Sequence, residues 1–216
     1  MVGAVIYELP ALDAPIRQGD IFEGIPRIDL SIAELSILNE NNQTEVVAWD
    51  AIRGQAGPIV AMTALRSVRA IVITQDCDTV RAPDISLCEI KRFADVVKVP
   101  APGSAKKWGD LLVRQAVANL KWFYLPADQH IGFAERMAVD FLATLRVNRD
   151  ELDAARHMRR GRLNETADEH FRERLSEFFR RYPYNEWYPF TKDEFDAYKA
   201  ARNEEADLIQ PYPYQT

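Results

Sequence analysis

The feature that most constrains the fold is a short apolar run, Ala70-Ile71-Val72-Ile73, in which three of the residues are β-branched. A strand that is apolar on both faces is typical of the centre of a sheet covered on both sides. The turn signal Arg81-Ala82-Pro83-Asp84 follows it. We therefore predict that residues 68–74 form a buried central strand.

Short strand patterns surround this run. The sequence predicts six or seven strands, mostly within residues 16–147, and then helices. Strands that come first and helices that come last indicate an α+β fold and not a doubly wound sheet. Strands of uneven length with tight turns favour a small, strongly curved β-barrel. A helix predicted over residues 104–116 would be inserted in it.

Three segments are expected along the chain. Residues 1–15 read as an extended arm, residues 16–147 as the β-barrel core, and residues 148–216 as a helical C-terminal extension. Within the core, residues 138–147 alternate apolar and polar, which predicts a strand with one apolar face. Capping boxes at residues 148–151 and 166–169 predict the starts of two helices. Phe171 and Leu175 would lie on the apolar stripe of the second helix.

Charge and composition argue against a general nucleic-acid binder, a disulfide-rich protein and a membrane protein. The net charge is −6, whereas a general nucleic-acid binder carries a basic footprint. The two cysteines, Cys77 and Cys88, fit a reducing compartment and no disulfide framework. No basic segment opens the chain, and no apolar run reaches the ~20 residues that span a bilayer. We expect a cytoplasmic protein without a membrane partner.

The sharpest candidate site is Thr74-Gln75-Asp76-Cys77-Asp78, directly after the predicted central strand. Strand ends present side chains to ligands from a rigid scaffold. We predict that Gln75, Asp76, Cys77 and Asp78 bind a ligand. The alternative is an ordinary turn in which the aspartates cap the backbone.

Other chemistries have weaker signals. Cys77 lies between two carboxylates, which disfavour its thiolate, and a histidine partner would have to come from His130, His157 or His170. A buried, inert cysteine is the simpler interpretation. The sequence has no zinc-ligand spacing, no phosphate-binding glycine loop and no nucleophile elbow. We expect no cofactor and no metal.

A basic patch lies in the C-terminal third, where Arg156, Arg159, Arg160 and Arg162 fall within seven residues. These cations could contact phosphates or an acidic partner. The alternative is a solvated helix end, because cations favour the helix C-terminus.

Two segments resemble the PemK/MazF-like toxin family. The stretch Arg17-Gln18-Gly19-Asp20-Ile21-Phe22 is similar to the RGD-containing strand that opens that family, and residues 69–74 to its apolar strand ending in Ser or Thr. Gln18 is an insertion, and Ala70 stands where the family has proline. The resemblance implies an SH3-like barrel, usually dimeric, that cleaves RNA without metal. It would place Arg17, Arg69 and Thr74 at the active face.

The chain also resembles a set of uncharacterised bacterial proteins with a QGDI segment and an [ST]-Q-x-C-D motif, here residues 18–21 and 74–78. That set brings no activity with it. We therefore predict a non-catalytic bacterial binding or regulatory module, in a toxin–antitoxin or phage-defence locus, that recognises a partner at residues 74–78. The alternative is a PemK/MazF-like, metal-independent endoribonuclease. A protein partner is expected first, with RNA and a second copy of the chain also open.

Overall fold

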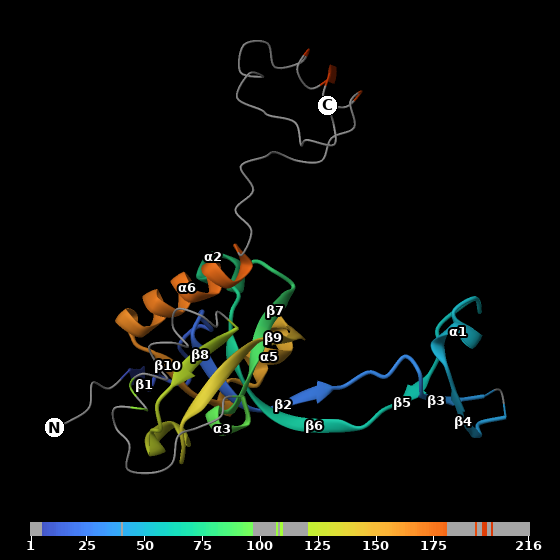
Figure 1. Ribbon diagram of the computed structural model, residues 1–216, viewed down its shortest axis with the longest axis horizontal. Helices are drawn as coiled ribbons and strands as arrows, with labels where there is room; N and C mark the ends of the chain where they lie inside the picture. The colour runs from blue at the N-terminus through green and yellow to red at the C-terminus, as the bar shows by residue number, and fades with distance from the viewer. Residues whose placement is uncertain are drawn as a thin grey trace. The chain divides into compact units, whose positions relative to one another are not determined.

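The structure is a computed structural model that describes residues 6–39, 41–96, 107, 109, 121–180, 193, 196–197 and 200. The chain divides into two units, Met1–Phe178 and Phe179–Thr216. The first unit holds all the strands described below (Figure 1). The helix predicted over residues 104–116 lies outside the described residues, apart from isolated positions.

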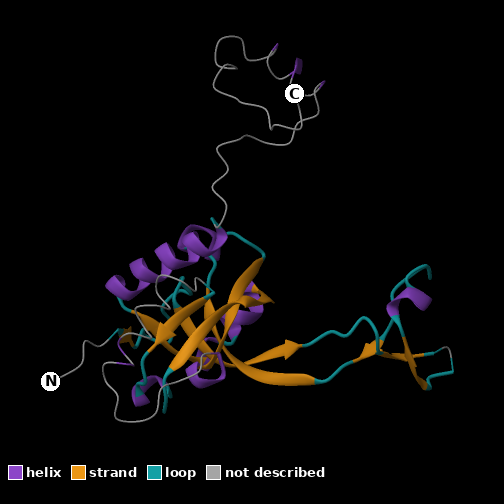
Figure 2. Ribbon diagram, viewed as in Figure 1, coloured by secondary structure: helices purple, strands orange, loops and turns teal. Residues whose placement is uncertain are grey.

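The main sheet has seven strands, all antiparallel to their neighbours, in the order β1-β10-β2-β6-β7-β9-β8. Strands are drawn in orange in Figure 2. In that order the strands are Tyr7–Glu8, Arg159–Leu163, Asp20–Ile28, Leu65–Val72, Asp84–Arg92, Met137–Asn148 and Trp122–Leu125. The α+β class is confirmed. The closed barrel that we expected is not observed among the described strands, because β1 and β8 end the order and do not pair with each other.

Both faces of the main sheet are buried, as the central run predicted. Ile71 of β6 lies in one apolar cluster, and its neighbours Ala70 and Val72 lie in another, all with no exposed surface. Helix α6, Glu165–Phe179, supplies Phe171 to the first cluster. Helix α5, Arg149–Ala154, supplies Leu152 to the second. Strand β6 is therefore the two-sided central strand that its composition indicates.

Strand β9 departs from the single apolar face that we predicted for residues 138–147. Val139 and Phe141 lie in the first cluster, whereas Leu145 and Val147 pack against the second. An irregularity in the pairing with β7 explains the change, since Cys88 pairs with Thr144 and Glu89 with Asp140. The three extra residues of β9 reverse which side chains face each way, because strand side chains alternate.

The segments outside residues 16–147 also build the sheet. Strand β1 belongs to the expected arm, and β10 and α6 belong to the expected helical extension. The Asn148 side chain caps α5 by accepting from Asp150 N and Glu151 N, as predicted. At α6 the capping side chain is Asn164, which accepts from Ala167 N, and not Thr166. The capping box predicted at residues 166–169 is therefore wrong, because the helix begins two residues earlier.

A second, three-stranded sheet is inserted between β2 and β6. Its order is β4-β3-β5, with bounds Thr44–Val47, Leu35–Leu38 and Ala61–Met62. Helix α1, Trp49–Ile52, packs with it around the buried residues Leu35, Ile37 and Ile52. The remaining elements are α2, Asp76–Thr79, α3, Phe93–Val96, and the 3-10 turns Gln129–Ile131 and Arg156–Met158. No helix within the described residues is both long and apolar enough to cross a membrane.

Candidate functional site

The predicted site residues follow β6 as expected. The strand ends at Val72, and the chain enters the single turn of α2 at Asp76. Thr74 Oγ1 accepts from Ser86 N at 2.7 Å, so this hydroxyl closes the pairing of the chain with β7. Gln75 precedes α2 in an extended conformation, and its carbonyl accepts from Asp78 N and Thr79 N. The end of β6 is therefore a rigid platform for Asp76.

Asp76 is held by the loop that precedes β2. Arg17 donates to Asp76 Oδ2 from Nε at 2.9 Å and from Nη2 at 2.7 Å. Gln18 N donates to Asp76 Oδ1 at 2.8 Å, and Gln18 Nε2 donates to the carbonyl of Ile73 at 2.9 Å. Two predicted site residues that are 59 positions apart, Arg17 and Asp76, are thus brought together.

Helix α6 adds two charged side chains to this pair. Arg172 Nη2 lies 3.7 Å from Asp76 Oδ2 and donates a short hydrogen bond to Asp168 Oδ2. The helix is fixed there because Phe171 and Leu175 are buried in the main core. We call Arg17, Asp76, Asp168 and Arg172 the strand-end site.

One atom of this site has an unmet hydrogen-bonding capacity. Among the described residues, Asp168 Oδ1 is the one buried side-chain nitrogen or oxygen without a hydrogen-bond partner. Asp168 as a whole is only 7% exposed. An acceptor left in this state costs roughly 1–3 kcal/mol, so such atoms are rare in native proteins. When they do occur, they often mark functional positions.

Gly19 makes the burial of Asp168 possible. Its φ is +82°, a left-handed conformation that favours glycine. A Cβ atom at this position would lie 2.9 Å from Asp168 Oδ1. The backbone is tied on both sides, since Gly19 N donates to Val72 O and Gly19 O accepts from Leu163 N. The backbone at Gly19 is therefore held in place beside the Asp168 carboxylate.

The two carboxylates of the site have opposite pKa shifts. Burial would raise the pKa of Asp76, but hydrogen bonds from Arg17 and Gln18 N outweigh it and lower the pKa below its ordinary value. Burial raises the pKa of Asp168, and the nearby Arg172 only partly offsets this. Because their pKa values shift in opposite directions, Asp76 favours the ionised form and Asp168 holds its proton to a higher pH.

The other residues of the predicted motif point elsewhere. Asp78 pairs with Arg81 at 3.0 Å, and both side chains are more than half exposed. The interpretation of Cys77 as a buried cysteine is wrong, because Cys77 is exposed and only Cys88 is buried; Cys77 Sγ lies 3.9 Å from Gln75 Oε1. No hydrogen bond in the described part of the chain joins Cys77 to a histidine. Nor do the described residues contain a group of three or more His, Cys, Asp or Glu side chains placed to hold a metal ion.

Arg69 lies in a different place from Arg17. It donates to Glu23 Oε1 at 2.9 Å, and its guanidinium lies 5.7 Å from the centre of the Phe133 ring. It lines an open pocket of about 360 Å³ that also includes Arg92 and Met137. The structure therefore does not join Arg17, Arg69 and Thr74 in one site.

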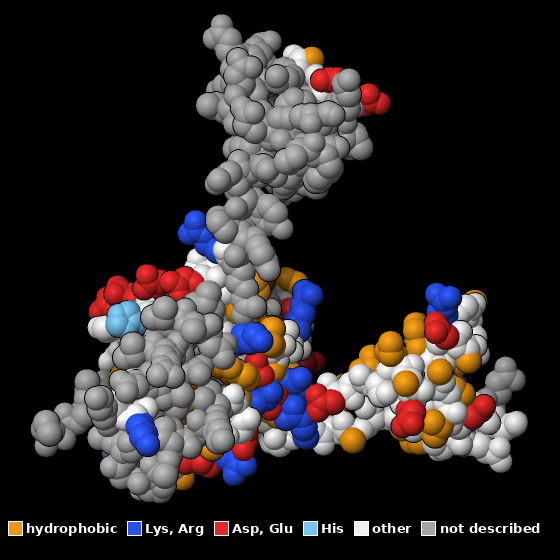
Figure 3. Space-filling model, viewed as in Figure 1, with side chains coloured by type: hydrophobic (Ala, Val, Ile, Leu, Met, Phe, Trp, Pro, Cys, Tyr) orange, Lys and Arg blue, Asp and Glu red, His pale blue; other side chains and the backbone are white. Residues whose placement is uncertain are grey.

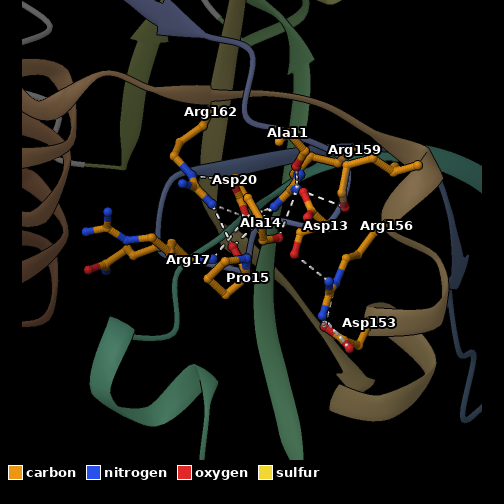
Figure 4. A network of polar contacts seen from close by, with 12 residues as sticks. Ala11, Asp13, Ala14, Pro15, Arg17, Asp20, Asp153, Arg156, Arg159 and Arg162 are labelled. Atoms are coloured by element: carbon orange, nitrogen blue, oxygen red, sulfur yellow. Dashed lines mark hydrogen bonds and ion pairs between the residues drawn. The ribbon is translucent and has the colours of Figure 1, made fainter.

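The predicted basic patch holds the N-terminal arm, which we define as residues 11–15 (Figure 4). Arg159 donates to the carbonyls of Ala11 and Ala14 at 2.7 and 3.0 Å, and Arg162 to that of Pro15 at 2.8 Å. Arg156 donates to Asp13 O at 2.8 Å. The fourth arginine, Arg160, pairs with Glu23 at 2.8 Å. All four arginines of the patch therefore make contacts within the chain, and residues 159–163 form strand β10 where we had considered a helix end.

Asp20 anchors this arm contact. It is completely buried and accepts from Arg162 at 2.6 and 3.0 Å, from Arg159 at 3.0 Å and from Arg17 N at 2.9 Å. In Figure 4 the two guanidinium groups converge on this carboxylate. Both oxygens are satisfied, which is the arrangement that a buried charge requires.

Sequence reasoning missed two residues of the strand-end site, Asp168 and Arg172, and the supporting contacts of Gln18. One signal was available: Asp168 lies three residues before Phe171 and seven before Leu175, which places a charge on the apolar stripe of α6. A charge on a buried stripe must find a partner or a function. Asp168 and Arg172 lie 92 and 96 residues after Asp76 in the sequence, so no local pattern connects them to it.

A scan against protein-family models finds no match to this chain, and a search of curated proteins finds none either. Function is therefore inferred from the geometry of the strand-end site.

Proposed function

We propose that this protein is a non-catalytic binding module that recognises a partner protein at the strand-end site. The observation that carries the proposal is the convergence of Arg17 and Arg172 on Asp76 Oδ2. Three separate segments of the chain meet there on a rigid sheet. Side chains that a rigid scaffold holds in this way are well placed to bind a partner.

The two guanidinium groups give the site its chemistry. The side chains of Arg17 and Arg172 are 50% and 47% exposed. Arg17 uses Nε and Nη2 for Asp76, and Arg172 uses Nη2 for Asp168, so neither half-exposed guanidinium uses all of its N–H donors in these contacts. Guanidinium groups held by carboxylates are preorganised to bind carboxylates or carbonyls of a partner. We therefore propose an acceptor-bearing, acidic or polar protein segment as the occupant, in keeping with a regulatory role.

Cys77 allows a direct test, because it is exposed and lies on α2 beside Asp76. Cys88 is buried, and burial raises the pKa of its thiol to about 12. A thiol-reactive photocrosslinker at neutral pH should therefore label Cys77 selectively. We expect irradiation in an extract of the native cells to yield a discrete adduct that is lost in Arg17→Ala and Arg172→Ala.

The matched control is Arg81→Ala, which removes a more exposed arginine of the same region that pairs with Asp78 outside the site. This variant should keep the adduct. An adduct that persists in Arg172→Ala, or labelled protein that captures nothing, would count against recognition at the strand-end site.

The ribonuclease alternative has less support. It needs Arg17, Arg69 and Thr74 around one phosphate, whereas Arg69 pairs with Glu23 and the Thr74 hydroxyl accepts from Ser86 N. Incubating the purified chain with RNA in EDTA tests it separately. Cleavage that is lost in both Arg69→Ala and Thr74→Ala would favour the ribonuclease over the binding module.

A further inference from the structure

The main sheet opens into a fork where β6 and β7 separate. These two strands pair over residues 69–72 and 87–90. Beyond that stretch β6 keeps its pairing with β2 as far as Leu65, and β7 keeps its pairing with β9 as far as Arg92. In Figure 1, β2 and β6 continue away from the sheet as a two-stranded ribbon. Residues of both β6 and β7 line the open pocket of about 360 Å³, which therefore lies in this fork. We call it the fork pocket.

Cations outnumber carboxylates on the walls of the fork pocket. Four cationic side chains line it against three carboxylates, although the whole chain has a net charge of −6. The four cations are Arg66, Arg69, Lys91 and Arg92. In Figure 3, Lys and Arg side chains gather, among Asp and Glu, where β2 and β6 leave the main sheet. A cleft with an excess of one charge attracts ions of the opposite sign. How each charge is paired decides where in the pocket such an ion would bind.

The most buried charge of the pocket belongs to a balanced cluster. The Glu89 side chain is 5% exposed and accepts from Arg66 at 2.6 and 3.0 Å and from Arg27 at 2.6 Å. Asp29 accepts from the Nε atoms of the same two arginines. Two cations are thus matched by two carboxylates, so the excess positive charge does not come from this cluster.

Two further cations of the pocket are matched one to one. Lys91 Nζ donates to Asp140 Oδ2 at 2.7 Å. Arg92 donates to both carboxylate oxygens of Asp95, at 2.7 and 2.8 Å. These pairs bring N–H donors to the pocket without adding to its net charge.

The excess charge lies at Glu23, which two arginines share. Glu23 Oε1 accepts from Arg69 Nε at 2.9 Å, and Glu23 Oε2 accepts from Arg160 Nε at 2.8 Å. Over the described residues, neither arginine forms an ion pair with a second carboxylate. One negative charge therefore faces two positive charges here, and only one of the two arginines, Arg69, lines the pocket.

Arg69 is also held in position. Its guanidinium lies 5.7 Å from the ring centre of Phe133, which is completely buried. Its contacts with Glu23 involve Nε and Nη2, and Nη1 takes part in neither of them. The side chain is nevertheless 33% exposed. A guanidinium that is fixed by an aromatic ring and a carboxylate loses little further freedom when it binds an anion.

We propose that the fork pocket binds the oxyanion, a phosphate or a carboxylate, of a small molecule, with Arg69 as the principal contact. The planar guanidinium matches both kinds of oxyanion. The volume of the pocket is near the lower end of the roughly 300–1,000 Å³ that is usual for ligand pockets, which favours a small molecule. The buried side chains of Val68, Ile90 and Met137 offer an apolar wall for the rest of that molecule. The fork pocket shares no residue with the strand-end site, and this proposal does not depend on the function proposed there.

Isothermal titration calorimetry of the purified full chain tests the proposal, with pyrophosphate and citrate as the two probes. At an ionic strength of about 50 mM, we expect at least one probe to bind with a Kd between about 10 µM and 1 mM. Arg69→Gln should weaken this binding roughly tenfold or more, because it removes the charged donor. The matched control Arg146→Gln removes an arginine that pairs with Asp84 at the opposite end of β7, and it should bind like the wild type.

A variant that should gain affinity guards against misfolding. Glu23→Gln keeps an oxygen that can accept from Arg69 and Arg160 but removes the negative charge, so it should bind the probe several-fold more tightly. Tighter binding of pyrophosphate would identify a phosphate ligand, and tighter binding of citrate a carboxylate ligand; either supports the proposal. Three results would overturn it: no binding of either probe below about 10 mM, equal binding by the wild type and Arg69→Gln, or weaker binding by Glu23→Gln with an unchanged circular dichroism spectrum.

Discussion

Two buried aspartates next to Gly19, its sequence neighbour Asp20 and its spatial neighbour Asp168, differ in how fully their oxygens are hydrogen-bonded. Asp20 is completely buried, and both of its oxygens accept hydrogen bonds from Arg17 N, Arg159 and Arg162. Asp168 is almost as buried, but one of its oxygens has no partner. The saturated carboxylate fixes the structure, whereas the unsaturated one retains capacity that folding does not use. Hydrogen-bond saturation therefore distinguishes Asp20, a carboxylate that stabilises the fold, from Asp168, a candidate functional carboxylate. The local sequence does not make this distinction.

The largest effect is expected from breaking the saturated cluster. Asp20→Ala would leave Arg159 and Arg162 buried without their counter-ion, and removing one partner of a buried pair costs roughly 3–5 kcal/mol. It would also free the arm carbonyls that the same arginines bind. Urea denaturation followed by circular dichroism should show this loss in the free energy of unfolding. A loss below about 1 kcal/mol would mean that the cluster is not the anchor of the arm.

The next largest loss of stability is expected from substituting Gly19, which neighbours both aspartates. Gly19→Ala combines a left-handed backbone with a Cβ that would lie 2.9 Å from Asp168 Oδ1. We expect a loss of about 2–3 kcal/mol in the same measurement. Gly57→Ala is the control, since Gly57 also has a positive φ but open space around its Cβ position. Equal losses in the two variants would show that only the backbone conformation, and not the collision with Asp168, matters.

A smaller effect should distinguish Asp76 from Asp168 by its pH dependence. The pKa of Asp76 is lowered, so its ionised form stabilises the fold above the ordinary pKa of 3.8, and this contribution is lost as pH falls through the folded-state pKa. Asp76→Asn should therefore cost about 1 kcal/mol at pH 7, allowing for partial exposure, and progressively less below pH 4.

Asp168 should give the opposite sign. Its pKa is raised, so ionisation costs stability that is absent below the ordinary value of 3.8 and grows as pH rises through the folded-state pKa. Asp168→Asn should accordingly gain on the wild type as pH rises from 3 to 7, by about 1 kcal/mol. Urea denaturation at pH 3, 5 and 7 measures both variants. Parallel pH curves for the two variants would contradict the opposite shifts.

The sequence revealed the parts of this architecture that depend on local pattern. The β-branched run at residues 70–73 identified the two-sided central strand, and Asn148 identified the start of α5. It did not reveal the open sheet, because whether a curved sheet closes depends on which strands pair at its edges. Strand β10 was hidden by its arginines, whose side chains bind the arm while the backbone pairs with β1 and β2.

The site was predictable in the same partial way. Asp76 was visible as a polar residue after a buried strand, and Arg17 only through a family resemblance. The contribution of α6 was not visible, since Asp168 and Arg172 reach Asp76 only when Phe171 packs in the core. Asp78 has the same local signal as Asp76 but no such partners, and its side chain is 52% exposed.

Asp78 therefore gives the smallest and most specific test of the comparison. Its exposed pair with Arg81 is worth little, so Asp78→Asn should change the free energy of unfolding by no more than about 0.5 kcal/mol at pH 7. The same amide substitution two residues earlier, at Asp76, is expected to cost more because Arg17 and Gln18 N both donate to that carboxylate. If the two variants lose equal stability, the contacts of the strand-end site do not set Asp76 apart from Asp78. A larger effect for Asp78→Asn would shift the site outward onto the exposed face of α2.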